Sequence, residues 1–83
     1  MKDIWIKVIE YASMPHLGLS RKLRAGYSIE FNGDGKVMDG DVVFEIYETY
    51  LRVISEEKGE VANIYYDWEK LASVKTTGSP KKK

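Results

Sequence analysis

The sequence predicts an all-β protein, folded as a small and strongly bent antiparallel barrel with roughly five or six short strands and one helical turn before the last strand. Three observations support this prediction. Between residues 27 and 77, β-branched and aromatic residues gather in short runs, polar breaks separate the runs, and no long helical stripe occurs. Such residues suit a pleated surface that is buried on one side. The chain therefore indicates a compact sheet rather than a helical bundle.

The first segment, residues 3–11, fits two structures. As a strand, it alternates Ile4, Ile6 and Val8 with their neighbours; as a helix, it presents one apolar face made of Ile4, Trp5, Val8, Ile9 and Ala12. Periodicity does not separate the two over so short a segment. Its β-branched and aromatic residues favour a strand.

Residues 13–26 are predicted to form a loop, with one helical turn near residues 20–23. Pro15, Gly18 and Gly26 interrupt this segment, and such residues mark turns and loops. The segment also holds the densest basic group outside the C-terminal tail, made of Arg21, Lys22 and Arg24.

Residues 27–31 are predicted to be a strand, with Tyr27, Ile29 and Phe31 on one face. The following Asn-Gly-Asp-Gly, residues 32–35, is a strong tight-turn signal because Asn and Gly tolerate positive φ angles. Residues 36–43 lead into the next strand, with a bulge or second turn at residues 39–40.

A change of apolar parity divides the next run into strands 41–47 and 50–55. Val42, Phe44 and Ile46 share one face, whereas Leu51 and Val53 have the opposite parity. One unbroken strand would expose half of this set, so a turn is expected at residues 48–49. A charged turn (56–59), a strand (60–66), a helical turn (67–71) and a last strand (72–77) follow.

We expect one domain over residues 1–76 and a disordered basic tail over residues 77–83. The tail contains Gly78, Pro80 and three terminal lysines, Lys81, Lys82 and Lys83. Short polar termini of this kind are commonly poorly ordered.

The segment GKVMDGDVVFEIYETYLRVI, residues 35–54, resembles the first motif of the Sm-like small barrels, and the strand pattern is similar to SH3-like barrels as well. The resemblance implies a bent barrel whose edges can pair with a second copy. Sm-like RNA binders carry an Asp and an Asn beside the bent turn, where this chain has Tyr47 and Leu51. Their second motif contains an Arg-Gly pair, which residues 64–71 lack. The resemblance therefore extends to architecture and not to uridine recognition.

Composition narrows the classes of function. The chain has 83 residues and no Cys, which excludes disulfides and thiolate metal sites. Lys plus Arg equals Asp plus Glu at 13 each, so the net charge of zero disfavours a dedicated duplex-DNA binder. No secretory-signal pattern occurs, and no apolar run approaches the roughly 20 residues that span a bilayer. We expect a soluble, cytoplasmic protein that does not enter membranes.

Catalytic and metal-binding patterns are weak, so we expect neither an enzyme nor a cofactor. His16 is the only histidine and follows Pro15 in the expected loop. The acidic residues fall mainly at turns, where they are usually solvated. The Asn32 loop looks oxygen-rich, yet a calcium loop needs an oxygen ligand where Lys36 stands and a Glu where Val43 stands. We predict a β-turn there and no metal.

The leading hypothesis is a non-enzymatic binding module that self-associates, as a dimer or ring, and docks an unidentified protein partner. Six Tyr and two Trp exceed what so small an interior holds, and surface Tyr and Trp commonly anchor interfaces. Trp68 is expected to be an exposed anchor, with a Trp that caps the open end of the barrel as the alternative. The expected partner-binding residues are Trp68, Tyr66, Tyr47 and Tyr50.

The alternative hypothesis is a barrel that binds single-stranded RNA or DNA, because such binders combine basic groups with aromatic stacking. Tyr65 and Tyr66 are neighbours in a strand, so only one of them can belong to a given platform. A third hypothesis is a small-ligand pocket between subunits. The residues expected to contact nucleic acid are Arg21, Lys22, Arg24, Tyr65, Lys81, Lys82 and Lys83.

Overall fold

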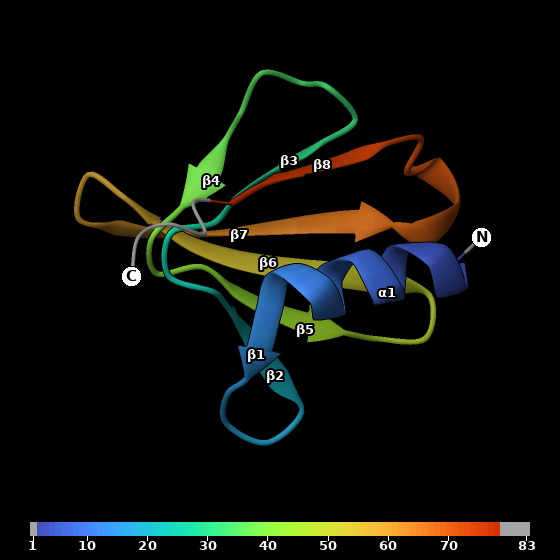
Figure 1. The fold of residues 1–83 in the computed structure, drawn as a ribbon, viewed down its shortest axis with the longest axis horizontal. Helices are drawn as coiled ribbons and strands as arrows, with labels where there is room; N and C mark the ends of the chain where they lie inside the picture. The colour runs from blue at the N-terminus through green and yellow to red at the C-terminus, as the bar shows by residue number, and fades with distance from the viewer. Residues whose placement is uncertain (1, 79–83) are drawn as a thin grey trace.

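A computed structural model describes residues 2–78 and shows a mainly β protein with one α-helix at its N-terminal end (Figure 1). The helix α1 is Lys2–Ala12, and a 3₁₀ turn, η1, is Trp68–Lys70. The strands are β1 (Ser13–Pro15), β2 (Ser20–Leu23), β3 (Ser28–Phe31), β4 (Met38–Asp39), β5 (Val43–Ile46), β6 (Tyr50–Glu57), β7 (Glu60–Asp67) and β8 (Val74–Thr77).

The strands form two antiparallel sheets. One has the order β1-β2-β5-β6-β7 and the other has the order β4-β3-β8. Two chain segments pass from one sheet into the other: β2 continues into β3, and β4 continues into β5. They stay paired at the bend, where the Leu23 N–H donates to the Val42 carbonyl at 2.9 Å. Among residues 2–78, the strand ladders do not close the two sheets into one barrel.

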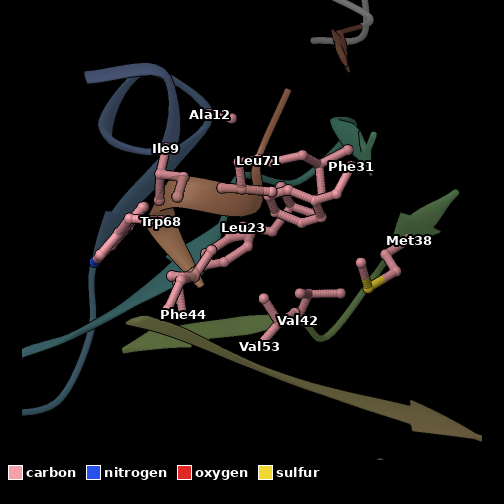
Figure 2. Close-up of a cluster of buried hydrophobic side chains, with 12 residues drawn as sticks. Ile9, Ala12, Leu23, Phe31, Met38, Val42, Phe44, Val53, Trp68 and Leu71 are labelled. Carbon is pink, nitrogen blue, oxygen red and sulfur yellow. The ribbon is translucent and has the colours of Figure 1, made fainter. Parts of the chain in front are cut away.

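One hydrophobic core lies between the sheets and beneath α1 (Figure 2). Phe44 and Val53 enter it from the five-stranded sheet, Phe31 enters from the three-stranded sheet, and Ile9 enters from the helix. All four side chains are fully buried. The predicted inner faces of strands 27–31, 41–47 and 50–55 are confirmed, because the alternating apolar residues of each strand are the ones that point into the core.

The predicted turns are confirmed in position. Asn32 and Gly33 have positive φ angles of 56° and 58°. The turn between β6 and β7 is tighter than expected, because β6 extends to Glu57 and only Lys58 and Gly59 lie outside the ladder. Both have positive φ angles, 51° and 82°, as a two-residue hairpin turn requires. The helical turn before the last strand is also confirmed, as η1.

The prediction of a strand over residues 3–11 is wrong, because these residues form α1. The helical alternative describes the buried side in part: Ile9 and Ala12 are buried, and Trp5 packs against the core. Ile4 of the expected face is 52% exposed, and Ile6 packs against the core as well. β-branched residues lower helix propensity only slightly, and tertiary packing routinely overrides that preference.

Two arginines from outside the helix complete its C-terminal end. The last carbonyls of an α-helix have no partner within it, and α1 has no basic residue in its last turn. Arg24 Nε donates to the Tyr11 carbonyl at 3.0 Å, and Arg21 Nη2 donates to the Glu10 carbonyl at 3.5 Å. The Ser13 hydroxyl also donates to the Ile9 carbonyl. These contacts depend on the fold and are invisible in the local sequence.

The loop predicted over residues 13–26 is also wrong, because β1 and β2 form a hairpin there. The helical turn expected at residues 20–23 is the strand β2, which pairs with both β1 and β5. This hairpin projects from the body of the molecule (Figure 1). At the other end, Thr77 belongs to β8 rather than to a tail. Lys81, Lys82 and Lys83 lie outside the described residues.

Candidate functional site

The outer face of the five-stranded sheet carries polar and aromatic side chains. Along β5, β6 and β7, every second residue points away from the core, because strand side chains alternate between faces. The ladder places Arg52 directly between Glu45 of β5 and Tyr65 of β7. The intervening Leu51 and Val53 are fully buried on the inner face.

Three tyrosines lie next to one another on this outer face, and we call them the tyrosine row. The rings of Tyr47 and Tyr50 stack with centroids 4.7 Å apart and planes 21° apart. The ring of Tyr65 lies 6.1 Å from that of Tyr50. Their exposed fractions are 40%, 37% and 60% for Tyr47, Tyr50 and Tyr65. Rings that are stacked and still exposed form a rigid contact surface at little entropic cost.

A polar network holds the row in place. The Tyr47 hydroxyl donates to Glu45 Oε1 at 2.6 Å, and Arg52 Nη1 donates to the same oxygen at 3.0 Å. Arg52 also donates to Asn63 Oδ1, from Nε at 3.2 Å and from Nη2 at 3.0 Å. The guanidinium therefore links three neighbouring strands across the face.

The hydrogen bond between Tyr47 and Glu45 changes the acidity of both groups. It is the largest influence on the Glu45 carboxyl and lowers its pKa. Burial raises this pKa by a smaller amount, and Arg52 lowers it further. The same hydrogen bond raises the pKa of Tyr47. The network is therefore strongest with an ionised carboxylate and a neutral phenol.

We expect Glu45→Gln to reduce the pH dependence of stability. The pKa of Glu45 is lower in the folded state than in the unfolded state. The ionised carboxylate therefore stabilises the fold at pH values above the unfolded pKa, and this stabilisation is lost as the pH falls through the folded pKa. At neutral pH, the substitution should cost about 0.5–1 kcal/mol. Urea unfolding from neutral to acidic pH measures the difference, which should vanish at the acidic end. Glu56→Gln, an exposed change on β6, is the control. Parallel curves for wild type and Glu45→Gln would contradict the role of this network.

A broad, open groove of about 1020 Å³ lies beside the row. The start of α1, the turn between β5 and β6, the end of β7 and η1 form its walls. The residues that line it include Lys2, Glu48, Tyr65, Tyr66, Asp67 and Glu69. Lys2 Nζ lies 3.5 Å from Glu48 Oε2. Among the described residues that line the groove, carboxylates thus outnumber ammonium groups.

The expectation that Trp68 is an exposed anchor is wrong. Its side chain is 3% exposed and lies within the buried cluster (Figure 2). Its indole Nε1–H donates to the Tyr47 carbonyl at 2.8 Å. Trp68 therefore belongs to the core and supports the backbone of Tyr47 in the tyrosine row. The capping alternative requires this burial, whereas among residues 2–78 the strand ladders form no closed barrel for Trp68 to cap. Tyr66 lies on the other side of β7 from Tyr65, as expected, and its ring packs 4.5 Å from that of Phe31. Burial raises the pKa of Tyr66.

The residues expected to contact nucleic acid do not gather around Tyr65. Arg21 and Arg24 donate to the end of α1, and Arg21 Nε also donates to Ser13 Oγ at 2.8 Å. Lys22 lies 4.0 Å from Asp41. Within the five-stranded sheet, β5 and β6 separate this basic group from β7.

The Asn32 loop serves the fold. The Asn32 side-chain oxygen accepts from the Ala72 N–H at 2.7 Å and from the Ser73 N–H at 3.4 Å, which ties the loop to the start of β8. Asp34 accepts from the Lys36 N–H at 2.8 Å within its own turn. His16 is exposed in the loop between β1 and β2. Among residues 2–78, no group of three or more His, Asp or Glu side chains is placed to hold a metal ion.

The sequence alone did not predict the polar network that holds the row, although it does show which of these residues share a strand face. Glu45 and Tyr47 are two residues apart, as are Asn63 and Tyr65, so each pair shares a face of its strand. Only the register between strands brings these pairs to Arg52.

No family model matches the chain, and searches of curated proteins and of solved structures found no match. In the part of the chain that is described, no helix has the length and apolar character needed to cross a membrane.

Proposed function

We propose that this protein is a non-enzymatic binding module that self-associates and docks a protein partner through the outer face of its five-stranded sheet. The tyrosine row carries the proposal, because it is ordered, stacked and exposed. Tyr and Arg are enriched in protein interfaces. Arg52 lies opposite Tyr65 in the ladder and shares Glu45 Oε1 with the Tyr47 hydroxyl. A rigid set of rings loses little conformational freedom when a partner covers it.

We further propose that the two sheets form a partly open barrel of the SH3-like or Sm-like type. Two bent segments shared between the sheets support this architecture, and so does the return of β8 to pair with β3 after η1. In this arrangement the core is wrapped from both sides while the outer face of β5, β6 and β7 stays free for contacts.

Self-association has support from the apolar surface outside the row. Leu17 and Leu19 are 74% and 92% exposed on the projecting hairpin, and Val61 is 66% exposed near the turn between β6 and β7, opposite Glu56. A protein of 83 residues has a small core, and association is one way in which small domains gain stability.

Sedimentation velocity tests this proposal. Wild type should form a dimer or a larger assembly at micromolar concentration. Tyr50→Ala and Tyr65→Ala should weaken the association about tenfold or more, because truncation of interface tyrosines commonly costs this much. Tyr11→Ala, which removes a tyrosine on α1 that is as exposed as Tyr65, should leave the assembly unchanged. A strictly monomeric wild type across the micromolar range would overturn the proposal.

Binding of single-stranded nucleic acid is the second candidate. Exposed tyrosines in a row favour it, because bases stack on aromatic rings with little sequence preference. Affinity for a mixed oligonucleotide should then fall steeply with salt, and removal of Lys81, Lys82 and Lys83 should reduce the slope. Absence of retention at low salt, or an affinity that salt does not change, would eliminate this candidate.

A further inference from the structure

Among residues 2–78, the outermost strand β7 has one edge without a neighbouring strand. β7 is Glu60–Asp67, it lies at the end of the five-stranded sheet, and within these residues its only ladder is the one with β6. It pairs with β6 through its whole length without a bulge. A long, regular edge strand presents unpaired backbone groups to which another chain can bind.

The hairpin turn determines which residues present these groups. Glu57 and Glu60 close a two-residue turn, and such a closing pair is hydrogen-bonded, with hydrogen-bonded and non-hydrogen-bonded pairs alternating beyond it. Ala62, Ile64 and Tyr66 therefore bond to β6. The intervening residues direct their N–H and C=O groups to the free edge; these are Val61, Asn63, Tyr65 and Asp67.

The other sheet edges of the described chain have features that hinder pairing. β1 has three residues and contains Pro15, β4 has two residues, and β8 has four residues and contains Lys75. Short strands, prolines and lysines are common protections of an edge. β7 has eight residues and contains no Pro, Lys or Arg.

Charge indicates what the edge binds. β7 begins with Glu60 and ends with Asp67. Within residues 2–78, the groove beside its C-terminal end adds the carboxylates of Glu48 and Glu69 and one ammonium group, that of Lys2. In an antiparallel pair of two β7 strands, the Asp67 end of each copy would lie beside the Glu60 end of the other. Carboxylates would meet at both ends, which disfavours a second copy. A positively charged segment would instead be attracted by the carboxylates at both ends of β7.

We propose that the free edge of β7 binds an extended, basic peptide segment of a partner protein as an additional antiparallel or parallel strand. This inference rests on the proposed docking of a protein partner and states the chemistry of that partner. Backbone hydrogen bonds to Val61, Asn63 and Tyr65 supply affinity, as in other cases of strand addition. The carboxylates of Asp67 and Glu69 select lysine or arginine side chains at the groove.

Amide hydrogen exchange followed by NMR tests the proposal. The probe is a capped synthetic peptide of alternating lysine and valine, about as long as β7. The peptide should slow exchange at Val61, Asn63 and Tyr65, whereas the amides of Ala62 and Ile64, already bonded to β6, should change little. A peptide of alternating glutamate and valine is the matched control and should bind at least about tenfold more weakly.

Two substitutions separate the edge from the charge. Val61→Pro removes an N–H from the free edge and keeps the ladder with β6, since proline is tolerated at the solvent side of an edge strand. It should weaken peptide binding about tenfold, whereas Val61→Thr should leave binding unchanged. Glu69→Lys should weaken binding of the lysine peptide severalfold. Glu10→Lys makes the same charge change about two helical turns along α1 from Lys2 and is its control.

The outcomes discriminate between the occupants. Alternating protection that appears only with the lysine peptide supports the proposal, even if wild type is monomeric and the tyrosine row proves unimportant. Protection at the same amides that grows with protein concentration alone would assign the edge to a second copy and overturn the proposal. Absence of protection on this edge at saturating lysine peptide would overturn it as well.

Discussion

Phe44→Ala is expected to lower the free energy of unfolding by about 3–5 kcal/mol, the usual cost of truncating a buried Phe. The Phe44 side chain is fully buried and belongs to the hydrophobic core (Figure 2). It lies on β5, one of the two segments that cross between the sheets, so the cavity would open where both sheets meet. Domains of this size commonly have only a few kcal/mol of stability from one core. We therefore expect the variant to be largely unfolded at room temperature.

Circular dichroism during urea and thermal unfolding measures this effect. Val43→Ala is the matched control, because Val43 is the neighbouring residue on β5 and lies on the outer face. It should cost less than about 1 kcal/mol. An unchanged melting temperature for Phe44→Ala would show that the inner and outer faces of β5 are assigned the wrong way round.

Trp68→Ala is the second substitution with a large expected effect, about 3–5 kcal/mol. It removes a buried indole from under the tyrosine row and leaves the Tyr47 carbonyl without its donor. The tyrosine row should therefore be disturbed together with the core. Trp68→Phe keeps most of the volume and should cost about 1–3 kcal/mol, chiefly through the lost hydrogen bond.

Near-ultraviolet circular dichroism and urea unfolding of both variants test this dual role. If Trp68 supports the row, Trp68→Phe should retain the fold while it reduces the aromatic signal of the ordered tyrosines. The surface change Tyr65→Ala is the control and should cost less than about 1 kcal/mol. A Trp68→Ala variant as stable as wild type would contradict the buried position of Trp68.

Much of the central sheet could be predicted because its information is local. The alternation around Phe44, the parity change before Leu51 and the positive φ angles at the turns are properties of short sequence windows. The two-residue alternation of side chains in a strand likewise predicted Tyr65 and Tyr66 on opposite faces of β7. These features need no knowledge of what packs against them.

The errors lie where distant residues decide the structure. α1 has a strand-like composition, but Arg21 and Arg24 complete its end from the following hairpin. β2 has little apolar periodicity and exists because β1 and β5 pair with it. Trp68 was expected at the surface, but Tyr47, 21 residues away in sequence, accepts the bond from its indole. The tyrosine row itself depends on the register of three strands.

Dilution of the labelled protein from millimolar to low micromolar concentration, followed by NMR chemical shifts at each step, tests most directly whether the outer sheet face is the contact surface. The tyrosine row predicts shifts concentrated at Tyr47, Tyr50, Arg52 and Tyr65, with the core residues unchanged. Shifts confined to Leu17 and Leu19 on the projecting hairpin would contradict it, and so would spectra that do not change with concentration.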